Sequence, residues 1–177
     1  MNLKKVDGGI MEKCAAVDGK DYYTVHTTTT ASPYNKVPTD ASDLLGQQIK
    51  VLVKLDSDNH VDSVYGVYAD EDSKVVATGL LGDFELDGSD KIKLNGTSYK
   101  LDGAQDSNVV YTAQQKPASV AKTNFSALAA LAVKGTITPT TAATSIKLID
   151  NDGNGKVDAA VITRLRLLRL PLFPRLL

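Results

Sequence analysis

Polar and apolar residues alternate along most of the first two thirds of the chain. The alternation is clearest in residues 48–55 and 61–68, which an acidic loop separates. Successive side chains of a strand point to opposite faces, so this pattern predicts strands with one buried face, and the two runs are predicted to pair as an antiparallel hairpin. Runs of β-branched and aromatic residues predict further strands at 22–27, 74–81, 83–86 and 108–112.

A second hairpin is predicted around the dipeptide Asn95-Gly96, which lies between the alternating runs 91–94 and 97–101. A two-residue turn of type I′ needs a positive φ at both central residues, and asparagine and glycine adopt that conformation at low cost. The sequence therefore predicts a tight type I′ turn at these two residues.

The pattern changes where alanine and leucine replace the alternating residues. Apolar residues recur at helical spacing from Phe125 onward, and either Thr123 or Asn124 can cap the start of such a helix. Gly135 is expected to end it. The sequence as a whole predicts a mainly β fold of antiparallel hairpins, arranged as a sandwich or a barrel, with one α-helix near 118–133.

These patterns divide the chain into five ranges. Residues 1–20 carry no firm secondary-structure signal, and residues 21–116 are predicted to form an antiparallel β domain. Residues 117–135 are predicted to be a helix and linker, and residues 136–163 a β-hairpin with an acidic turn. The last range, 164–177, differs from all the others in composition.

This C-terminal tail holds seven leucines and four arginines, but no Asp, Glu, Gly, Thr or Val. A Thr-Val repeat read one base out of frame becomes Arg-Leu-Arg-Leu, which is the sequence found at residues 164–167. The tail is therefore predicted to be out of frame and not to pack as part of the domain. The alternative is a basic, leucine-rich anchor on a membrane surface, although Pro171 and Pro174 shorten any helix there.

The clearest chemistry lies in the segment Asp-Asn-Asp-Gly-Asn-Gly-Lys-Val-Asp at residues 150–158. It places oxygen ligands at alternate positions around a glycine, as calcium-binding loops do. It is not an EF-hand, which ends in a bidentate glutamate where this chain has Val161. A shorter calcium-binding β-turn is therefore predicted, and its ligands are Asp150, Asp152, Asn154, Lys156 through its carbonyl, and Asp158.

The same residues also suit a tight turn without a metal. Asparagine, aspartate and glycine tolerate left-handed backbone conformations and bond to their own main chain. The sequence leaves both interpretations open. A second acidic segment, residues 56–62, has similar ligand spacing but no glycine where the turn would need one, so it is predicted to be a hairpin loop.

Composition and charge exclude several classes of protein. The chain is 42% hydrophobic and 23% charged, which is typical of globular proteins and not of disordered ones. A net charge of −1 gives no reason to expect a nucleic-acid partner. No apolar run is long enough to span a bilayer, and the N-terminus has no apolar run of the kind found in export signals. The single cysteine, Cys14, excludes an internal disulfide and a cysteine-based zinc site.

Residues with catalytic chemistry are few. The two histidines, His26 and His60, lie on a predicted strand and in an acidic turn, and neither has the context of a nucleophile and its base. The aspartates lie in turns, where this residue is common, and no glycine-rich phosphate-binding loop is present. The chain is therefore predicted not to be an enzyme, and calcium is its predicted cofactor.

Four segments, residues 45–55, 64–67, 91–99 and 147–160, together resemble the β-rich region of Gram-positive surface-layer proteins that carry S-layer homology domains elsewhere in the chain. The last segment is the most specific, because its acidic turn leads directly into a valine-rich strand. The resemblance implies an exported, non-enzymatic, self-associating and calcium-dependent coat protein, tethered to cell-wall polysaccharide by another module. This chain shows neither an export signal nor a wall-binding repeat, so it is expected to be a fragment.

The sequence thus predicts a structural protein of a bacterial cell surface, whose partners are its own copies or other surface-layer subunits. Two alternatives stay open. One is an accessory glycan-binding β module of a secreted enzyme, with tyrosines as its contacts, although the tyrosines fit half-buried strand positions better. The other is a phage-encoded or intracellular structural protein, which the missing export signal favours.

Overall fold

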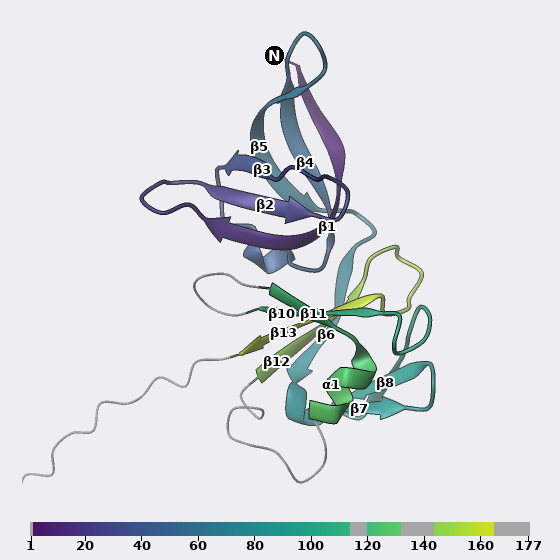
Figure 1. Ribbon diagram of the computed structural model, residues 1–177. Helices are drawn as coiled ribbons and strands as arrows, with labels where there is room; N and C mark the ends of the chain where they lie inside the picture. The colour runs from purple at the N-terminus through teal and green to yellow at the C-terminus, as the bar shows by residue number, and fades with distance from the viewer. Residues whose placement is uncertain (1, 114–119, 132–143, 165–177) are drawn as a thin grey trace, which may run out of the picture.

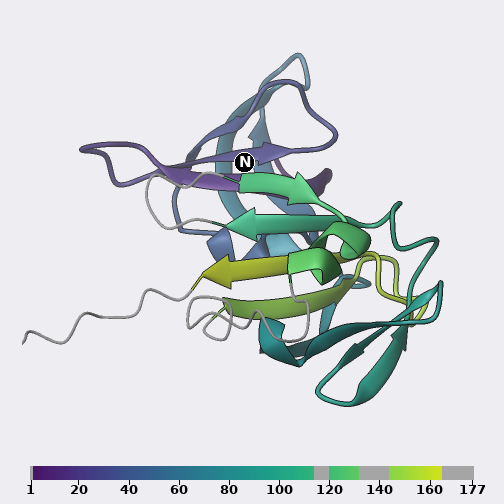
Figure 2. The same cartoon turned by 60° about the horizontal axis from the view of Figure 1, so that its bottom comes forward.

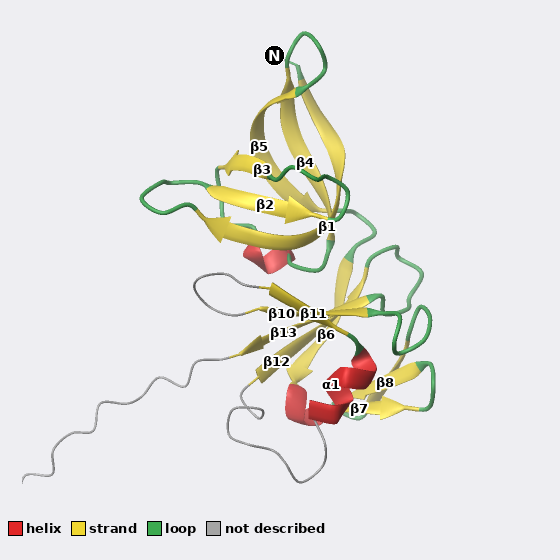
Figure 3. Cartoon of the chain, in the orientation of Figure 1, coloured by secondary structure: helices red, strands yellow, loops and turns green. Residues whose placement is uncertain are grey.

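The computed structural model describes residues 2–113, 120–131 and 144–164. In this part of the chain, two five-stranded sheets and one three-stranded sheet form a mainly β structure with one short α-helix (Figures 1 and 3). The predicted fold class is therefore confirmed. The C-terminal range 165–177 and the predicted helix end at Gly135 lie outside the described residues.

The first sheet curls into a nearly closed barrel. Its strand order is β3-β2-β1-β4-β5, and the two outer strands approach each other. The predicted antiparallel hairpin is confirmed as β4 and β5. The strands of the barrel are β1 (Leu3–Ala16), β2 (Tyr23–Thr27), β3 (Tyr34–Val37), β4 (Gln48–Leu55) and β5 (Val61–Ala69), with a short 3-10 turn, η1 (Ser42–Leu44), before β4.

Strand β1 corrects the interpretation of residues 1–20, which carry no firm strand signal in the sequence. The strand is 14 residues long. Its first half pairs with β4, and its second half pairs with β2. The change of partner follows an irregularity at Gly8 and Gly9, where Gly9 has a φ of +81°. Two glycines interrupt the alternating pattern at the point where the strand must bend, and this interruption hides the strand in the sequence.

The second sheet has the order β11-β10-β13-β12-β6, and Figure 2 shows β11, β10, β13 and β12 side by side. Strands β10 and β13 are parallel, and the other neighbours are antiparallel. The predicted C-terminal hairpin is confirmed as β12 and β13. The strands are β6 (Lys74–Leu80), β10 (Val109–Ala113), β11 (Val120–Thr123), β12 (Thr144–Asp150) and β13 (Ala159–Arg164).

The third sheet is small and antiparallel, and it lies beside helix α1 (Phe125–Leu131). Asn95 and Gly96 have φ angles of 53° and 79°, so the positive φ values predicted for the type I′ turn are confirmed. The sheet consists of β7 (Phe84–Asp87), β8 (Lys91–Leu94) and β9 (Thr97–Lys100), preceded by the 3-10 turn η2 (Leu81–Asp83).

The second sheet is a middle layer with both faces buried. On one face Ile149 and Val161 pack into the barrel core, and on the other face Ile146 and Ile162 pack against α1 and the small sheet. Strands that are buried on both faces read as continuous apolar runs, as residues 159–162 do. The core on the barrel side includes Met11, Val25, Ile49, Val51 and Tyr111, and the other core includes Phe84, Ile92, Leu94, Phe125 and Leu128.

The sheets do not follow the predicted ranges. Strands β6 and β10 lie within the range 21–116, but they belong to the same sheet as β12 and β13. The helix is shorter than the predicted range 118–133, because residues 120–123 pair with β10 as strand β11. Of the two possible caps, Asn124 is the one used, since its side-chain oxygen accepts a hydrogen bond from the Ala127 N–H at 2.8 Å.

Candidate functional site

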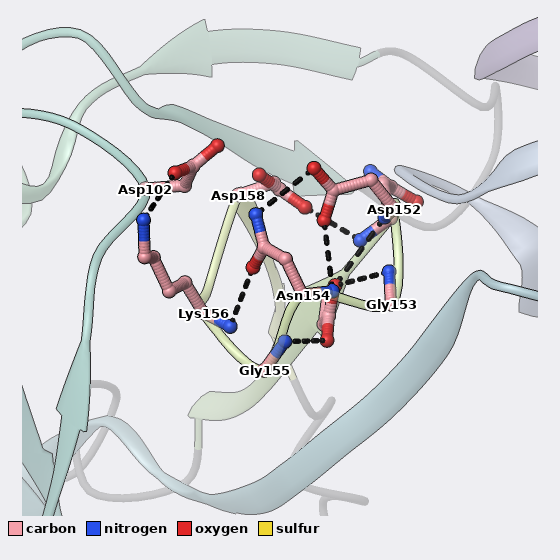
Figure 4. Close-up of polar contacts among 9 residues, drawn as sticks. Asp102, Asp152, Gly153, Asn154, Gly155, Lys156 and Asp158 are labelled. Atoms are coloured by element: carbon pink, nitrogen blue, oxygen red, sulfur yellow. Dashed lines mark hydrogen bonds and ion pairs between the residues drawn. The ribbon is translucent and has the colours of Figure 1, made fainter.

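The acidic loop joins β12 to β13 and is organised by its first aspartate. Asp150 is only 4% exposed, and its two carboxylate oxygens accept hydrogen bonds from three backbone N–H groups of the loop. Gly153 and Gly155 both have a positive φ, +73° and +83°, which lets the chain turn tightly around this carboxylate. Asp150 therefore acts as the centre of the loop, and Figure 4 shows Gly153 and Gly155 in this turn.

The side chain of Asn154 is also used within the loop. Its oxygen accepts the Lys156 N–H at 2.8 Å, and its nitrogen donates to Asp152 Oδ2 at 2.9 Å. These bonds hold the carboxylate of Asp152 in place (Figure 4). The predicted ligand Lys156 directs its ammonium group to Asp102, with 3.2 Å between Lys156 Nζ and Asp102 Oδ1.

Three carboxylates converge beside the loop. Asp102, Asp152 and Asp158 each place an oxygen within 4.8 Å of the others. The sequence prediction includes Asp152 and Asp158, but it misses Asp102, which follows β9. Main-chain hydrogen bonds bring Asp102 to the site, because its N–H donates to the Val157 carbonyl at 3.0 Å. No local pattern in the sequence connects Asp102 with the loop.

Burial and neighbouring charge act together on Asp158. Burial raises the pKa of its carboxyl group, and the nearby carboxylates of Asp152, Asp102 and Asp150 raise it further. A hydrogen bond from the Asn151 N–H, at 2.6 Å, opposes this rise in pKa. The ionised form of Asp158 is therefore held in an environment that disfavours its negative charge.

We expect Asp158→Asn to be more stable than the native chain at pH 7 in the absence of calcium. Because folding raises the pKa of Asp158, the bound proton contributes its full stability below the unfolded pKa of about 3.9, and this contribution is lost as the pH rises through the folded pKa. Asparagine carries no charge and keeps an oxygen that accepts the Asn151 N–H.

Thermal melting in a chelator from pH 4 to pH 7 measures this effect. The difference in melting temperature between Asp158→Asn and the native chain should increase with pH. Asp21→Asn, at an exposed loop position, should show no such increase. If the difference in melting temperature does not change with pH, the negative charge of Asp158 does not destabilise the folded state.

The residue after Asp150 connects the loop to the barrel. Asn151 Oδ1 accepts the Gln48 N–H at 2.8 Å, 103 residues away, and Asn151 Nδ2 donates to the Gly46 carbonyl at 3.0 Å. The hydroxyl of Ser73 also donates to Asn151 Oδ1 and accepts from the amide of Gln47. The acidic loop therefore lies at the junction of the barrel and the second sheet and bonds to both.

The three convergent carboxylates are suitable ligands for a hard divalent cation. Calcium takes six to eight oxygen ligands at about 2.3–2.6 Å, from carboxylates, carbonyls and water. Asp102, Asp152 and Asp158 supply oxygens of this kind from two segments of the chain, and a cation would offset the repulsion among their charges. The residues therefore fit calcium, with water completing the coordination.

The second acidic segment forms a hairpin loop in which Asp56, Asp58 and His60 also lie within 4.8 Å of one another. Asp56 Oδ1 accepts the N–H groups of Asp58 and His60, both at 2.9 Å. Asn59 takes the positive φ, 62°, that a glycine would otherwise supply. All three side chains are exposed, and these hydrogen bonds explain the loop without a metal.

No protein-family model, curated protein or solved structure matches this chain. Within the described residues, none of the helices has the length and apolar character needed to cross a membrane. The tyrosines differ in burial: Tyr65 and Tyr68 are 44% and 48% exposed on β5, whereas Tyr111 is only 2% exposed.

Proposed function

We propose that this chain is a non-enzymatic structural module of a bacterial cell surface, similar to the β-rich region of surface-layer proteins, and that calcium rigidifies it. The observation that carries the proposal is the position of the acidic loop. Its carboxylates converge with Asp102, and its Asn151 bonds to the barrel. A cation bound there would stabilise the connection between the barrel and the second sheet.

The ligands of this ion are Asp102, Asp152 and Asp158. Asp150 supports them indirectly, because its oxygens hold the loop backbone in the conformation that presents Asp152. Lys156 reduces the negative charge at Asp102 in the absence of the ion. The module would then be more mobile at the junction when calcium is low and more rigid outside the cell, where calcium is plentiful.

A rigid, calcium-dependent module suits a protein that associates with its own copies in a surface coat. Repeated assembly requires each copy to present the same surface, and a fixed angle between the barrel and the second sheet meets that requirement. The resemblance of four segments to surface-layer proteins supports the same conclusion. The proposed location is therefore the cell surface, and the proposed partners are other copies or related subunits.

We expect calcium to raise the melting temperature of the native chain. A ligand that binds only the folded state stabilises it by about 2.7 kcal/mol when its concentration is a hundred times its dissociation constant. Asp102→Asn and Asp152→Asn should lose most of this increase, because each removes one carboxylate from the cluster. The measurement is thermal melting with calcium, with magnesium and with a chelator.

Asp21→Asn is the matched control, since it removes an exposed aspartate outside the cluster. It should keep the full calcium-dependent increase. The proposal of a calcium-stabilised module fails if calcium leaves the melting temperature of the native chain unchanged, or if the cluster variants respond to calcium as fully as the control does.

A further inference from the structure

A cleft of about 460 Å³ opens between the barrel and the second sheet, next to the acidic loop. We call it the junction cleft. Its lining includes the apolar side chain of Val109, the ring of Tyr111, and the carboxylates of Asp70, Asp72, Asp152 and Asp158. Among the described residues that line it, none is a lysine, arginine or histidine. Clefts of this size between structural units are common binding sites for small molecules.

The charge of the junction cleft is negative. Lys50 is not one of the lining residues, but its Nζ lies 3.1 Å from Asp70 Oδ2 and balances the negative charge of that carboxylate. Asp72 is exposed, and its carboxylate has no hydrogen bond or ion pair with any described residue. Asp152 and Asp158 accept hydrogen bonds from backbone N–H groups of the loop, and neither forms an ion pair with a described residue. A ligand of opposite charge would therefore be attracted to the cleft.

Tyr111 is a separate reason to expect a ligand. It is 98% buried, being 2% exposed, and its hydroxyl group forms no hydrogen bond with any described residue. Burial raises the pKa of this tyrosine to about 12, so the phenol is neutral at physiological pH. A ligand in the cleft with an N–H group would donate a hydrogen bond to the phenol oxygen.

We propose that the junction cleft binds a small aliphatic diamine or polyamine. Its ammonium groups would pair with Asp72 and with the loop carboxylates Asp152 and Asp158, and its methylene chain would lie along Val109 and Tyr111. An inorganic cation satisfies the carboxylates alone, whereas an aliphatic amine also covers the apolar lining. The inference concerns the same loop as the calcium proposal, because the two ligands share Asp152 and Asp158.

The test is a calorimetric titration of the native chain with 1,5-diaminopentane at constant ionic strength. Asp72→Asn should weaken binding about fivefold, the effect of removing one exposed ion pair. Tyr111→Phe should also weaken it, because it removes the hydroxyl and keeps the ring. Asp102→Asn should change amine binding much less, because Asp102 does not line the cleft. Saturating calcium should compete with the amine.

The two aspartate variants separate this inference from the proposed function. Asp102 belongs to the calcium cluster and not to the cleft, whereas Asp72 lines the cleft and lies outside the cluster. Equal weakening of amine binding by Asp72→Asn and Asp102→Asn would indicate general charge attraction and would overturn the cleft as the site. Absence of any diamine binding overturns it as well. Loss of the calcium response with amine binding intact contradicts only the calcium proposal.

Discussion

Gly46→Ala is expected to lower the free energy of unfolding by about 2–5 kcal/mol. Gly46 lies between η1 and β4, at the face of the barrel that meets the second sheet. Its φ is +79°, which an alanine adopts only with strain. A Cβ atom there would also lie 2.9 Å from Val161 Cγ2 and 3.1 Å from Ile149 Cδ1, both in the second sheet.

Two other glycines separate the backbone effect from the packing effect. Gly88 has a φ of +72°, and no atom lies within 4 Å of a Cβ added there. Gly88→Ala should therefore lower the free energy of unfolding only through backbone strain. Gly82 has neither a positive φ nor a close neighbour, so Gly82→Ala should be nearly neutral. Urea unfolding of the three variants measures these differences. If Gly46→Ala costs no more than Gly88→Ala, the barrel and the second sheet are not tightly packed at this point.

Asn151→Ala is the other substitution with a large expected effect, a loss of about 2–5 kcal/mol. The substitution removes the partners of the Gly46 carbonyl and the Gln48 N–H, which the native side chain bonds at 3.0 and 2.8 Å. A buried polar group that loses its partner costs about 1–3 kcal/mol. Gln47 and Ser73, both 5% exposed, belong to the same network and would lose part of their support.

Urea unfolding, followed by circular dichroism, tests this prediction. Asn35→Ala is the matched control, because Asn35 is exposed on β3 and makes no side-chain hydrogen bond with the described residues. It should be within about 0.5 kcal/mol of the native chain. A similarly small effect of Asn151→Ala would mean that water replaces the side chain at the junction, and the loop would then not hold the two sheets together.

Both substitutions act at the contact between the barrel and the second sheet, where the junction cleft lies. If the barrel and the second sheet separate, Asp70 and Asp72 no longer face the acidic loop, and the junction cleft is lost. The carboxylate cluster itself depends on the contact between Val157 and the segment around Lys100, which lies within the C-terminal part of the structure. Gly46→Ala should therefore weaken amine binding more than calcium binding.

Local rules account for the parts of the structure that the sequence predicts well. The hairpin of β4 and β5 follows from alternation, and the turn at Asn95 and Gly96 follows from the conformations that these two residues tolerate. Both depend on residues close in the chain. The acidic loop is also visible in the sequence, because its aspartates and glycines lie within nine residues of one another.

The long first strand shows where local rules fail. Residues 3–16 contain Gly8 and Gly9, which are unfavourable in regular strands, and yet β1 passes through them. A Cβ atom at Gly8 would lie 2.8 Å from Ile49 Cγ1. The close approach of β4 therefore favours glycine at a position where strand propensity opposes it, and only the packed barrel reveals this reason.

The sequence by itself determined the β class, the two tight hairpins and the acidic loop, because each depends on periodicity or turn chemistry within a few residues. The tertiary structure alone decided that β10 pairs in parallel with β13, that Asp102 joins Asp152 and Asp158, and that Asn151 bonds to the barrel. These contacts join residues that are far apart in the chain. The burial of whole sheet faces brings these residues together, and no local pattern encodes which faces will pack.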